Sequence, residues 1–149
     1  MPPASSKPRR WRVVLDTNSW ISNYIRPHSL VAGRLEQLLN NVGVELLFSA
    51  ELRDEILRVI SRTKFSRFIS PDELLTYCKQ VKGFKLTTVV SEVAACRDPN
   101  DNFLLALCQD GHADFLITGD QDLLVLERFG PTRILSWVAA EDVPGLLVT

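Results

Sequence analysis

The sequence is poor in the residues that build disulfide frameworks and zinc sites. It has three cysteines, Cys78, Cys96 and Cys108, with no C-x-x-C spacing, and two histidines, His28 and His112, that lie far apart. Disulfide-stapled domains usually carry an even number of cysteines, and structural zinc sites need closely spaced Cys and His pairs. We therefore expect neither kind of site, and we expect each Cys and His to be an ordinary core, surface or loop residue.

Long apolar runs are also missing. No stretch approaches the roughly 18 consecutive apolar residues of a membrane span, and no apolar segment follows the basic residues near the N-terminus as it would in a secretory signal. We therefore expect a cytoplasmic protein that does not enter a membrane.

The composition fits one globular domain behind a short tail. The chain has 149 residues, of which 46% are hydrophobic and 23% are charged, enough for a single sizeable core. Residues 1–10 are rich in Pro, Ser and basic side chains and show no periodicity, which predicts a disordered basic tail. Residues 11–149 are expected to form the domain.

Charge is sorted along the chain although the net charge is only -1. Between residues 58 and 85 basic side chains dominate, whereas between residues 92 and 122 acidic ones do. This asymmetry fits a bound polyanion beside a cation-binding carboxylate cluster, although solvated helix faces produce charge runs more often. The candidate residues for binding such a polyanion are Arg58, Arg62, Lys64 and Arg67.

Two apolar runs end in an acid. Residues 12–15 lead into Asp16, and residues 115–117 lead through Thr118 and Gly119 into Asp120. Buried strands of a parallel sheet finish in this way, and ligands of such sheets bind beyond the carboxyl ends of the strands. Asp16 and Asp120 are therefore site candidates. The alternative for Asp16 is a simple helix cap.

Two more acids are predicted to lie on helices that face the same edge. Glu55 falls on the flank of the apolar face formed by Leu52, Ile56 and Val59, so we expect it to be half-buried. A surface ion pair on that helix, with Arg58 as the obvious partner, is the alternative. Asp101 heads a helical face that must be buried, and it has no obvious partner in the sequence, whereas Asp98 is expected to cap the same helix.

Helical and strand patterns alternate along the chain, which predicts an α/β fold of three α/β/α layers around a mainly parallel sheet. Besides the two acid-ending strands, strands are predicted over 45–48, 87–90 and 133–136. Helices are predicted over 19–26, 29–40, 49–61, 71–81, from Asp98 to a stop at Gly111, over 121–128, and in a short segment from Val138.

Four carboxylates without a nearby His or Cys, and without a glycine-rich phosphate loop, suit a hard divalent cation. Mg²⁺ and Mn²⁺ prefer such all-oxygen sites, and zinc does not. One or two such ions can activate water and neutralise a leaving oxygen in phosphodiester hydrolysis.

The chain resembles the PIN domain over about residues 12–137. The resemblance rests on four motifs in order: Val14-Leu15-Asp16-Thr17-Asn18, Glu55 within residues 52–57, Asp98-Pro99-Asn100-Asp101 with residues 102–104, and Thr118-Gly119-Asp120-Gln121-Asp122 with its flanking apolar residues. The most similar branch is that of the toxin components of toxin–antitoxin systems, the VapC-like ribonucleases.

This resemblance implies a Mg²⁺- or Mn²⁺-dependent endoribonuclease with an acidic quartet of catalytic metal ligands. It also implies a homodimer and a cognate antitoxin protein that inhibits it tightly. The quartet would be Asp16, Glu55, Asp101 and Asp120, with Asp122 as an accessory ligand and with Thr17, Asn18 and Thr118 as hydrogen-bonding supports.

Three alternatives remain open from the sequence. A phosphoaspartate receiver needs an acid pair after its first strand and a Lys near its last, and a haloacid-dehalogenase-like phosphatase needs an Asp where this chain has Asn18. A catalytically idle PIN-like binding module would keep the fold without the reaction, and a metal-dependent RNA cleavage assay separates it from the enzyme.

Overall fold

The computed structural model describes residues 9–147. Its elements follow in the order β1 (Trp11–Leu15), α1 (Thr17–Ile25), α2 (Leu30–Asn40), β2 (Val44–Leu46), α3 (Ala50–Ile60), the 3₁₀ helix η1 (Thr63–Phe65), α4 (Pro71–Lys82), the 3₁₀ helix η2 (Pro99–Asp101), α5 (Asn102–Gly111), β3 (Phe115–Ile117), α6 (Gln121–Leu124), β4 (Arg128–Phe129), β5 (Thr132–Leu135) and α7 (Trp137–Ala140). The predicted tail lies outside the described residues except for Arg9 and Arg10, which contact Asp114 and the Val44 carbonyl.

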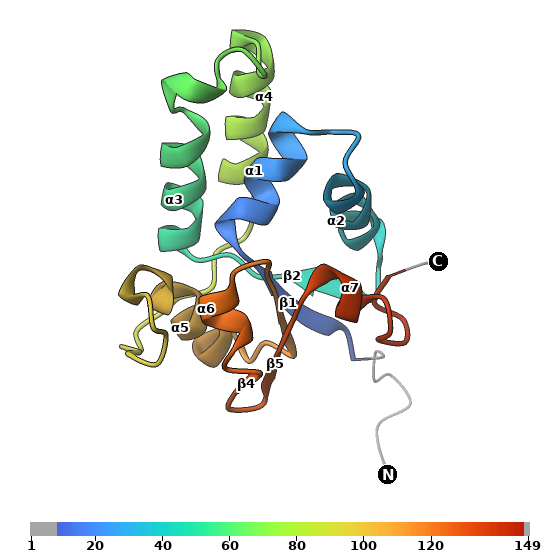
Figure 1. Cartoon of the computed structure of the whole chain (residues 1–149), viewed down its shortest axis with the longest axis vertical. Helices are drawn as coiled ribbons and strands as arrows, with labels where there is room; N and C mark the ends of the chain where they lie inside the picture. The colour runs from blue at the N-terminus through green and yellow to red at the C-terminus, as the bar shows by residue number, and fades with distance from the viewer. Residues whose placement is uncertain (1–8, 148–149) are drawn as a thin grey trace.

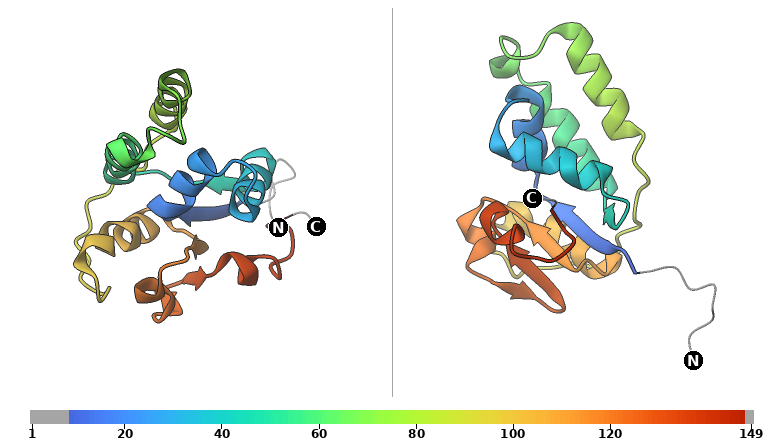
Figure 2. Two further views of the ribbon diagram at one scale, coloured as in Figure 1. Left: turned by 45° about the horizontal axis from the view of Figure 1, so that its top comes forward. Right: turned by 90° about the vertical axis from the view of Figure 1, so that its right-hand side faces the viewer.

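A single sheet organises these elements. Its strand order is β2-β1-β3-β5-β4, with β2, β1, β3 and β5 parallel and β4 antiparallel to β5. Helices α1 to α4 gather on one side of the strands in Figure 1, and α5 lies on the other, which gives the three-layer α/β/α arrangement that the sequence predicts. Figure 2 shows the same separation from two further directions. Within residues 9–147, no helix is long and apolar enough to cross a membrane.

The predicted helix starts are confirmed at the serine caps. The side-chain oxygens of Ser29, Ser49 and Ser70 accept backbone N–H groups at the starts of α2, α3 and α4, and Ser70 forms a full capping box with Glu73. Each bond satisfies a donor that the first helical turn leaves unpaired. These caps fix the starts of the helices that flank the sheet edge.

The predicted strand over 87–90 is wrong. Beyond an isolated bridge between Phe48 and Leu86, this segment does not join the sheet. The Asp110 carboxylate instead accepts the backbone N–H groups of Val90 and Ser91, at 2.7 and 2.9 Å. A tertiary contact from α5 therefore takes the donors that a strand ladder would use.

The helix predicted over 121–128 is too long, because α6 ends at Leu124. Glu127 has a positive φ of 59°, and Arg128 already pairs with Arg133 in the β4–β5 hairpin, which turns through Gly130 at φ 57°. The strand predicted over 45–48 likewise ends at Leu46. These endings follow tertiary pairing rather than local propensity.

Helix α5 ends at Gly111, as predicted. The left-handed C-cap is His112, at φ 53°. Gly111 is instead the last helical residue, where an added Cβ would lie 2.8 Å from Cδ1 of Leu47. A glycine at this position allows α5 to pack closely against the chain that follows β2.

Candidate active site

Asp16 lies directly after β1 and is only 5% exposed. Its Oδ1 accepts the backbone N–H and hydroxyl of Ser19, at 2.9 and 2.5 Å. Its Oδ2 accepts the Thr118 hydroxyl at 2.6 Å and the Gly119 N–H at 3.3 Å. The helix-cap interpretation of Asp16 is therefore correct, and the same bonds hold the carboxylate in one orientation at the sheet edge.

Asp120 reaches the same edge because β1 and β3 are neighbouring parallel strands, with Leu15 opposite Ile117. The backbone N–H of Asp120 donates to the Thr118 hydroxyl at 3.0 Å, and that hydroxyl donates to Asp16. Thr118 is fully buried. One threonine thus links the two strand-end acids, and Asp120 itself caps α6 by accepting the N–H of Asp122 at 2.9 Å.

Asp101 lies at the junction of η2 and α5, after Asp98 has capped η2 by accepting the N–H of Asn100. Its Oδ2 is buried and has no hydrogen-bond partner among the described residues. Burial raises the pKa of Asp101 to about 7, and contact with Asp120 and the charges of Asp120, Asp98 and Asp16 add to the rise. Without a cation, this site favours a protonated Asp101.

Glu55 is half-buried on α3, as predicted, but it is also ion-paired. The Arg58 guanidinium donates to its Oε2 at 2.6 Å, and the Glu55 side chain is 31% exposed. The helix-surface ion pair considered for this position is therefore present. The pair engages one oxygen of the Glu55 carboxylate, Oε2.

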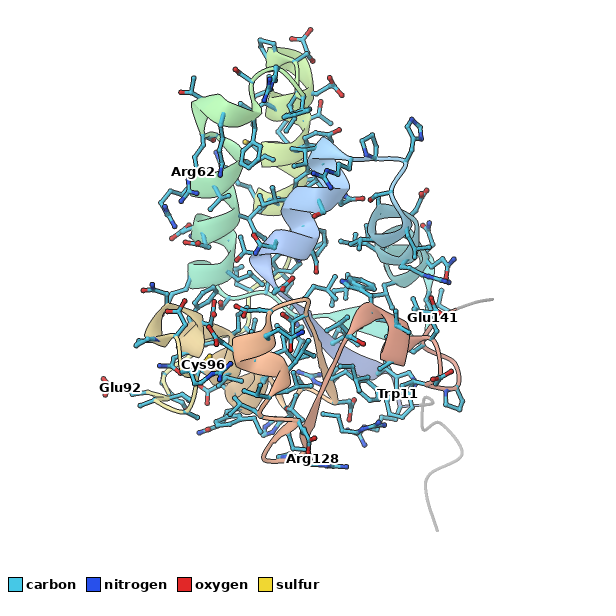
Figure 3. The ribbon with its side chains drawn as sticks, viewed as in Figure 1. Trp11, Arg62, Glu92, Cys96, Arg128 and Glu141 are labelled. Atoms are coloured by element: carbon cyan, nitrogen blue, oxygen red, sulfur yellow. The ribbon has the colours of Figure 1, made fainter. Side chains whose placement is uncertain are left out.

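All four predicted acids line one cleft, which we call the acid cleft. Its volume is about 170 Å³. Thr17 and Asn18 line it beside Asp16, and Arg62 at the end of α3 is the basic side chain that reaches it. Figure 3 shows Arg62 alongside α3. The acid cleft is lined by Asp16, Thr17, Asn18, Glu55, Val59, Arg62, Asn100, Asp101, Phe103, Leu104, Asp120 and Leu123.

Several other predicted residues lie elsewhere. Asp122, the predicted accessory ligand, is not among the cleft-lining residues and pairs with Arg97 at 2.8 Å. Lys64 and Arg67 are exposed beside the rings of Phe65 and Phe68. Of the four predicted RNA-binding side chains, the structure brings Arg62 to the acid cleft and commits Arg58 to Glu55.

Two polar residues at the site, Ser19 and Asn100, are not among the residues predicted from the sequence. Ser19 lies three residues after Asp16, the spacing at which a backbone N–H donates to an N-cap side chain. The sequence therefore contained the signal that predicts this contact. Asn100 lines the acid cleft from η2, and its neighbours Asp98 and Pro99 give only a helix-start signal.

The donor set of the acid cleft fits a hard divalent cation better than any other group. Its charged oxygen donors are the carboxylates of Asp and Glu, which hard cations prefer. The buried Oδ2 of Asp101 has no hydrogen-bond partner, and a cation would provide one. Among residues 9–147, however, no three His, Cys, Asp or Glu side chains are already spaced to hold an ion. Occupation of the cleft by an ion therefore needs side-chain movement.

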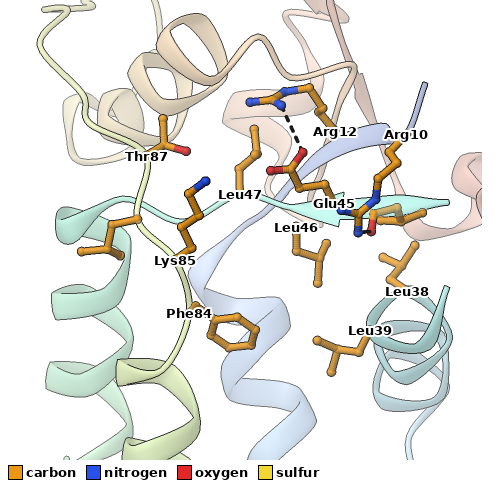
Figure 4. A pocket seen from close by; sticks show the side chains of 12 residues that line it. Arg10, Arg12, Leu38, Leu39, Glu45, Leu46, Leu47, Phe84, Lys85 and Thr87 are labelled. Atoms are coloured by element: carbon orange, nitrogen blue, oxygen red, sulfur yellow. Dashed lines mark hydrogen bonds and ion pairs between the residues drawn. The ribbon is translucent and has the colours of Figure 1, made fainter. Parts of the chain in front are cut away.

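A wider pocket of about 480 Å³ lies away from these acids, beside the edge strand β2 (Figure 4). Its acidic residue, Glu45, is held by Arg12 at 3.0 Å, and Arg10 and Lys85 give it a basic rim. It offers no carboxylate cluster, so the acid cleft is the candidate active site.

Comparison with known families agrees with this geometry. A family model described as PIN domain matches residues 12–122, which include all four acids of the cleft. A comparison with curated proteins gives no match to the chain.

Proposed function

The chain belongs to the PIN domain family, whose members are generally nucleases, and on this basis we propose that it is a metal-dependent endoribonuclease that hydrolyses RNA phosphodiester bonds. One observation carries the proposal. Four acids from four separate segments line a single cleft, and one of them has a buried oxygen without a partner. A structural role for these acids gives no reason for a buried Asp101 oxygen, Oδ2, without a partner.

PIN domains usually use divalent metal ions, and Asp16, Asp101 and Asp120 are the residues that would hold Mg²⁺ or Mn²⁺ here, joined by Glu55. When bound, such an ion supplies an activated water and charge neutralisation at the leaving oxygen. The chain supplies the rest. Ser19 and Thr118 fix the Asp16 carboxylate, and Asp101 must release its proton before it can serve as a ligand.

The experiment that tests this proposal is RNA cleavage by the purified chain with EDTA and then with added Mg²⁺ or Mn²⁺. We expect cleavage only with the ion and internal rather than terminal cuts. Undiminished cleavage in EDTA would contradict the metal-dependent mechanism.

Glu55 and Glu51 give a matched pair of variants on α3. Glu51 lies one turn before Glu55 and lines the adjoining pocket but not the acid cleft. We expect Glu55→Gln to slow RNA cleavage by roughly 10- to 100-fold, the range found when partners of a bound metal are lost, and Glu51→Gln to leave it nearly unchanged. Loss of the Glu55–Arg58 pair on the helix surface costs at most about 0.5 kcal/mol of stability, so both variants should melt alike. Equal losses of cleavage in Glu55→Gln and Glu51→Gln would show that Glu55 has no special role in the reaction.

Arg62 is positioned to bind an RNA phosphate beside the acids. We expect Arg62→Ala to weaken RNA binding and to lower the slope of log K against log salt by about 0.7, the value for one lost phosphate contact on a single strand. Arg53→Ala is the control, because Arg53 pairs with Asp54 on the same helix and does not line the acid cleft. An unchanged slope for Arg62→Ala would place the RNA elsewhere.

The Glu55–Arg58 pair supports a second candidate function, a catalytically idle PIN-like RNA-binding module. In that case Arg58 keeps Glu55 neutralised and the three remaining acids do not assemble a working site. RNA binding without cleavage at any Mg²⁺ or Mn²⁺ concentration would favour this module over the enzyme.

We also propose that the protein is the toxin of a type II toxin–antitoxin pair, a homodimer inhibited by a cognate antitoxin protein. The support is the sequence resemblance to VapC-like ribonucleases stated above. Light scattering at micromolar concentration tests the dimer directly, and a monomer there would contradict it.

A further inference from the structure

A second cleft opens beside the first and shares its acids. It has a volume of about 300 Å³, and Asp16, Asn18 and Asp120 line both clefts. The second cleft contains neither Glu55, Arg62 nor Asp101, and its lining includes Val31 of α2 and Trp137 of α7 beside Ser19, Ser22 and Gly119. We call it the tryptophan cleft.

Trp137 is held in place at several points. It is the first residue of α7, which Ser136 caps by accepting the N–H of Ala139 at 3.1 Å. Its indole Nε1–H donates to the Ser19 hydroxyl at 3.0 Å, and that hydroxyl donates to Asp16. The ring is only partly buried against the core. An anchored indole thus keeps part of its surface at the cleft wall.

The two walls of the tryptophan cleft are tied together. Arg34 of α2 forms an ion pair with Glu141, the residue that follows α7. Figure 3 shows Glu141 beside α7, on the side of the molecule away from Arg62. Asp16 and Asp120 therefore line both the cleft that Arg62 reaches and the cleft that Trp137 lines.

Single-stranded RNA has the complementary pattern of a charged backbone and flat bases. Proteins bind its phosphates with cations and stack its bases on aromatic side chains. An anchored, part-exposed indole suits stacking because little conformational entropy is lost when a base docks on it. Core packing alone explains the buried part of Trp137 but not its surface at the cleft.

We propose that Trp137 is a nucleobase-binding residue, on whose indole the base of a nucleotide next to the scissile phosphate stacks while that phosphate lies at Asp16 and Asp120. This inference rests on the proposed ribonuclease function for the position of the phosphate. Through Ser19, Trp137 is also a positioning residue for the Asp16 carboxylate.

The first test is a substrate series that needs no protein variant. Once the cleavage site is mapped, single abasic nucleotides are placed on either side of it. We expect one of these positions to lower kcat/KM of the wild-type protein by roughly 5- to 150-fold, the range for losing one stacked base. Equal kcat/KM for all the abasic substrates would overturn the inference.

Two variants separate stacking from structure. Trp137→Leu removes the aromatic face, and Trp137→Phe keeps a ring while losing the donor to Ser19. We expect an abasic nucleotide at that position to leave kcat/KM of Trp137→Leu unchanged, because the stacking face is already gone, and Trp137→Phe to retain the base dependence although both variants lose the bond to Ser19. Equal losses for Trp137→Leu on intact and abasic RNA would assign Trp137 a structural role only.

A binding measurement distinguishes failure of this inference from failure of the nuclease proposal. Intrinsic fluorescence is followed while a short RNA is added to the wild type, to Trp137→Phe and to the control Trp11→Phe, since Trp11 starts β1 at the end opposite Asp16. We expect RNA to quench the wild type and Trp11→Phe but not Trp137→Phe. If RNA quenches the wild type and Trp11→Phe but not Trp137→Phe and is not cleaved, the base-binding inference holds and the nuclease proposal fails. If RNA is cleaved and quenches all three proteins equally, the base-binding inference alone fails.

Discussion

Asp16→Asn is expected to lower RNA cleavage by roughly 100-fold or more, since even partners outside the metal's own ligands are worth about 10- to 100-fold. The Asp16 carboxylate accepts four hydrogen bonds, from Ser19, Thr118 and Gly119. An asparagine amide keeps the size of the side chain but turns one acceptor into a donor. The ligand charge is lost, and the fixed N–H of Ser19 or Gly119 faces another donor.

The same substitution should cost stability, because a buried donor left unpaired costs about 1–3 kcal/mol. Melting must therefore be measured with activity, at a temperature where both proteins are folded. Asp114→Asn is the matched control, because Asp114 accepts the N–H of Arg12 at 2.9 Å beside the opposite end of β3 and does not line the acid cleft. It should lose stability but not its rate of cleavage. Full activity of folded Asp16→Asn at matched Mg²⁺ would remove Asp16 from the reaction.

Mg²⁺ or Mn²⁺ is expected to raise the melting temperature by about 5–10 °C when the ion is at 100 times its Kd, which corresponds to about 2.7 kcal/mol. The physical reason is the crowding of four carboxylates in one cleft. Their repulsion and the burial of Asp101 disfavour the ionised apo state, and a cation relieves both. The comparison must be made at constant ionic strength, because general screening also weakens repulsion.

Asp101 gives this effect a defined pH dependence. Its pKa is near 7 in the folded chain against an ordinary 3.8, so between those values the folded state binds more protons than the unfolded state. Stability of the metal-free protein then falls as pH rises through that window and levels off above about pH 7. Metal affinity should rise over the same window because the ion requires the ionised carboxylate.

Asp101→Asn should remove both effects of that carboxylate. We expect the metal-free variant to melt above the wild type at pH 8, with a flatter pH dependence and a smaller response to Mg²⁺. Asp54→Asn is the control, because Asp54 is exposed and pairs with Arg53 outside the acid cleft. If Asp101→Asn simply destabilises the metal-free protein and Mg²⁺ has no effect, the acids are structural caps.

The sequence predicts those parts of the fold that depend on neighbours along the chain. The apolar run before Asp16 and the one before Asp120 become adjacent parallel strands, so both acids reach one edge. The serine caps of α2 and α3 are also local features that can be read from their residue type and position. Local patterns of this kind, together with the rule that parallel strands end at one edge, were enough to predict that the four acids lie together.

The remaining features depend on contacts between distant residues. At the end of the segment predicted as a strand over 87–90, the N–H groups of Val90 and of the following Ser91 donate to Asp110 of α5 rather than to a neighbouring strand. Trp137 was predicted only as the residue before a short helix, since its bond to Ser19 spans 118 residues. At Glu55 the sequence supported both half-burial and an ion pair, and the structure shows the two together.

Binding of Mn²⁺, followed by the loss of its free-ion electron paramagnetic resonance signal, tests most directly whether the four acids hold a divalent cation. The wild type should bind the ion and Glu51→Gln should match it, whereas Asp16→Asn and Asp101→Asn should each bind roughly 10- to 100-fold more weakly. The contrary result is a wild type that leaves the Mn²⁺ signal unchanged, or one whose binding survives both aspartate substitutions.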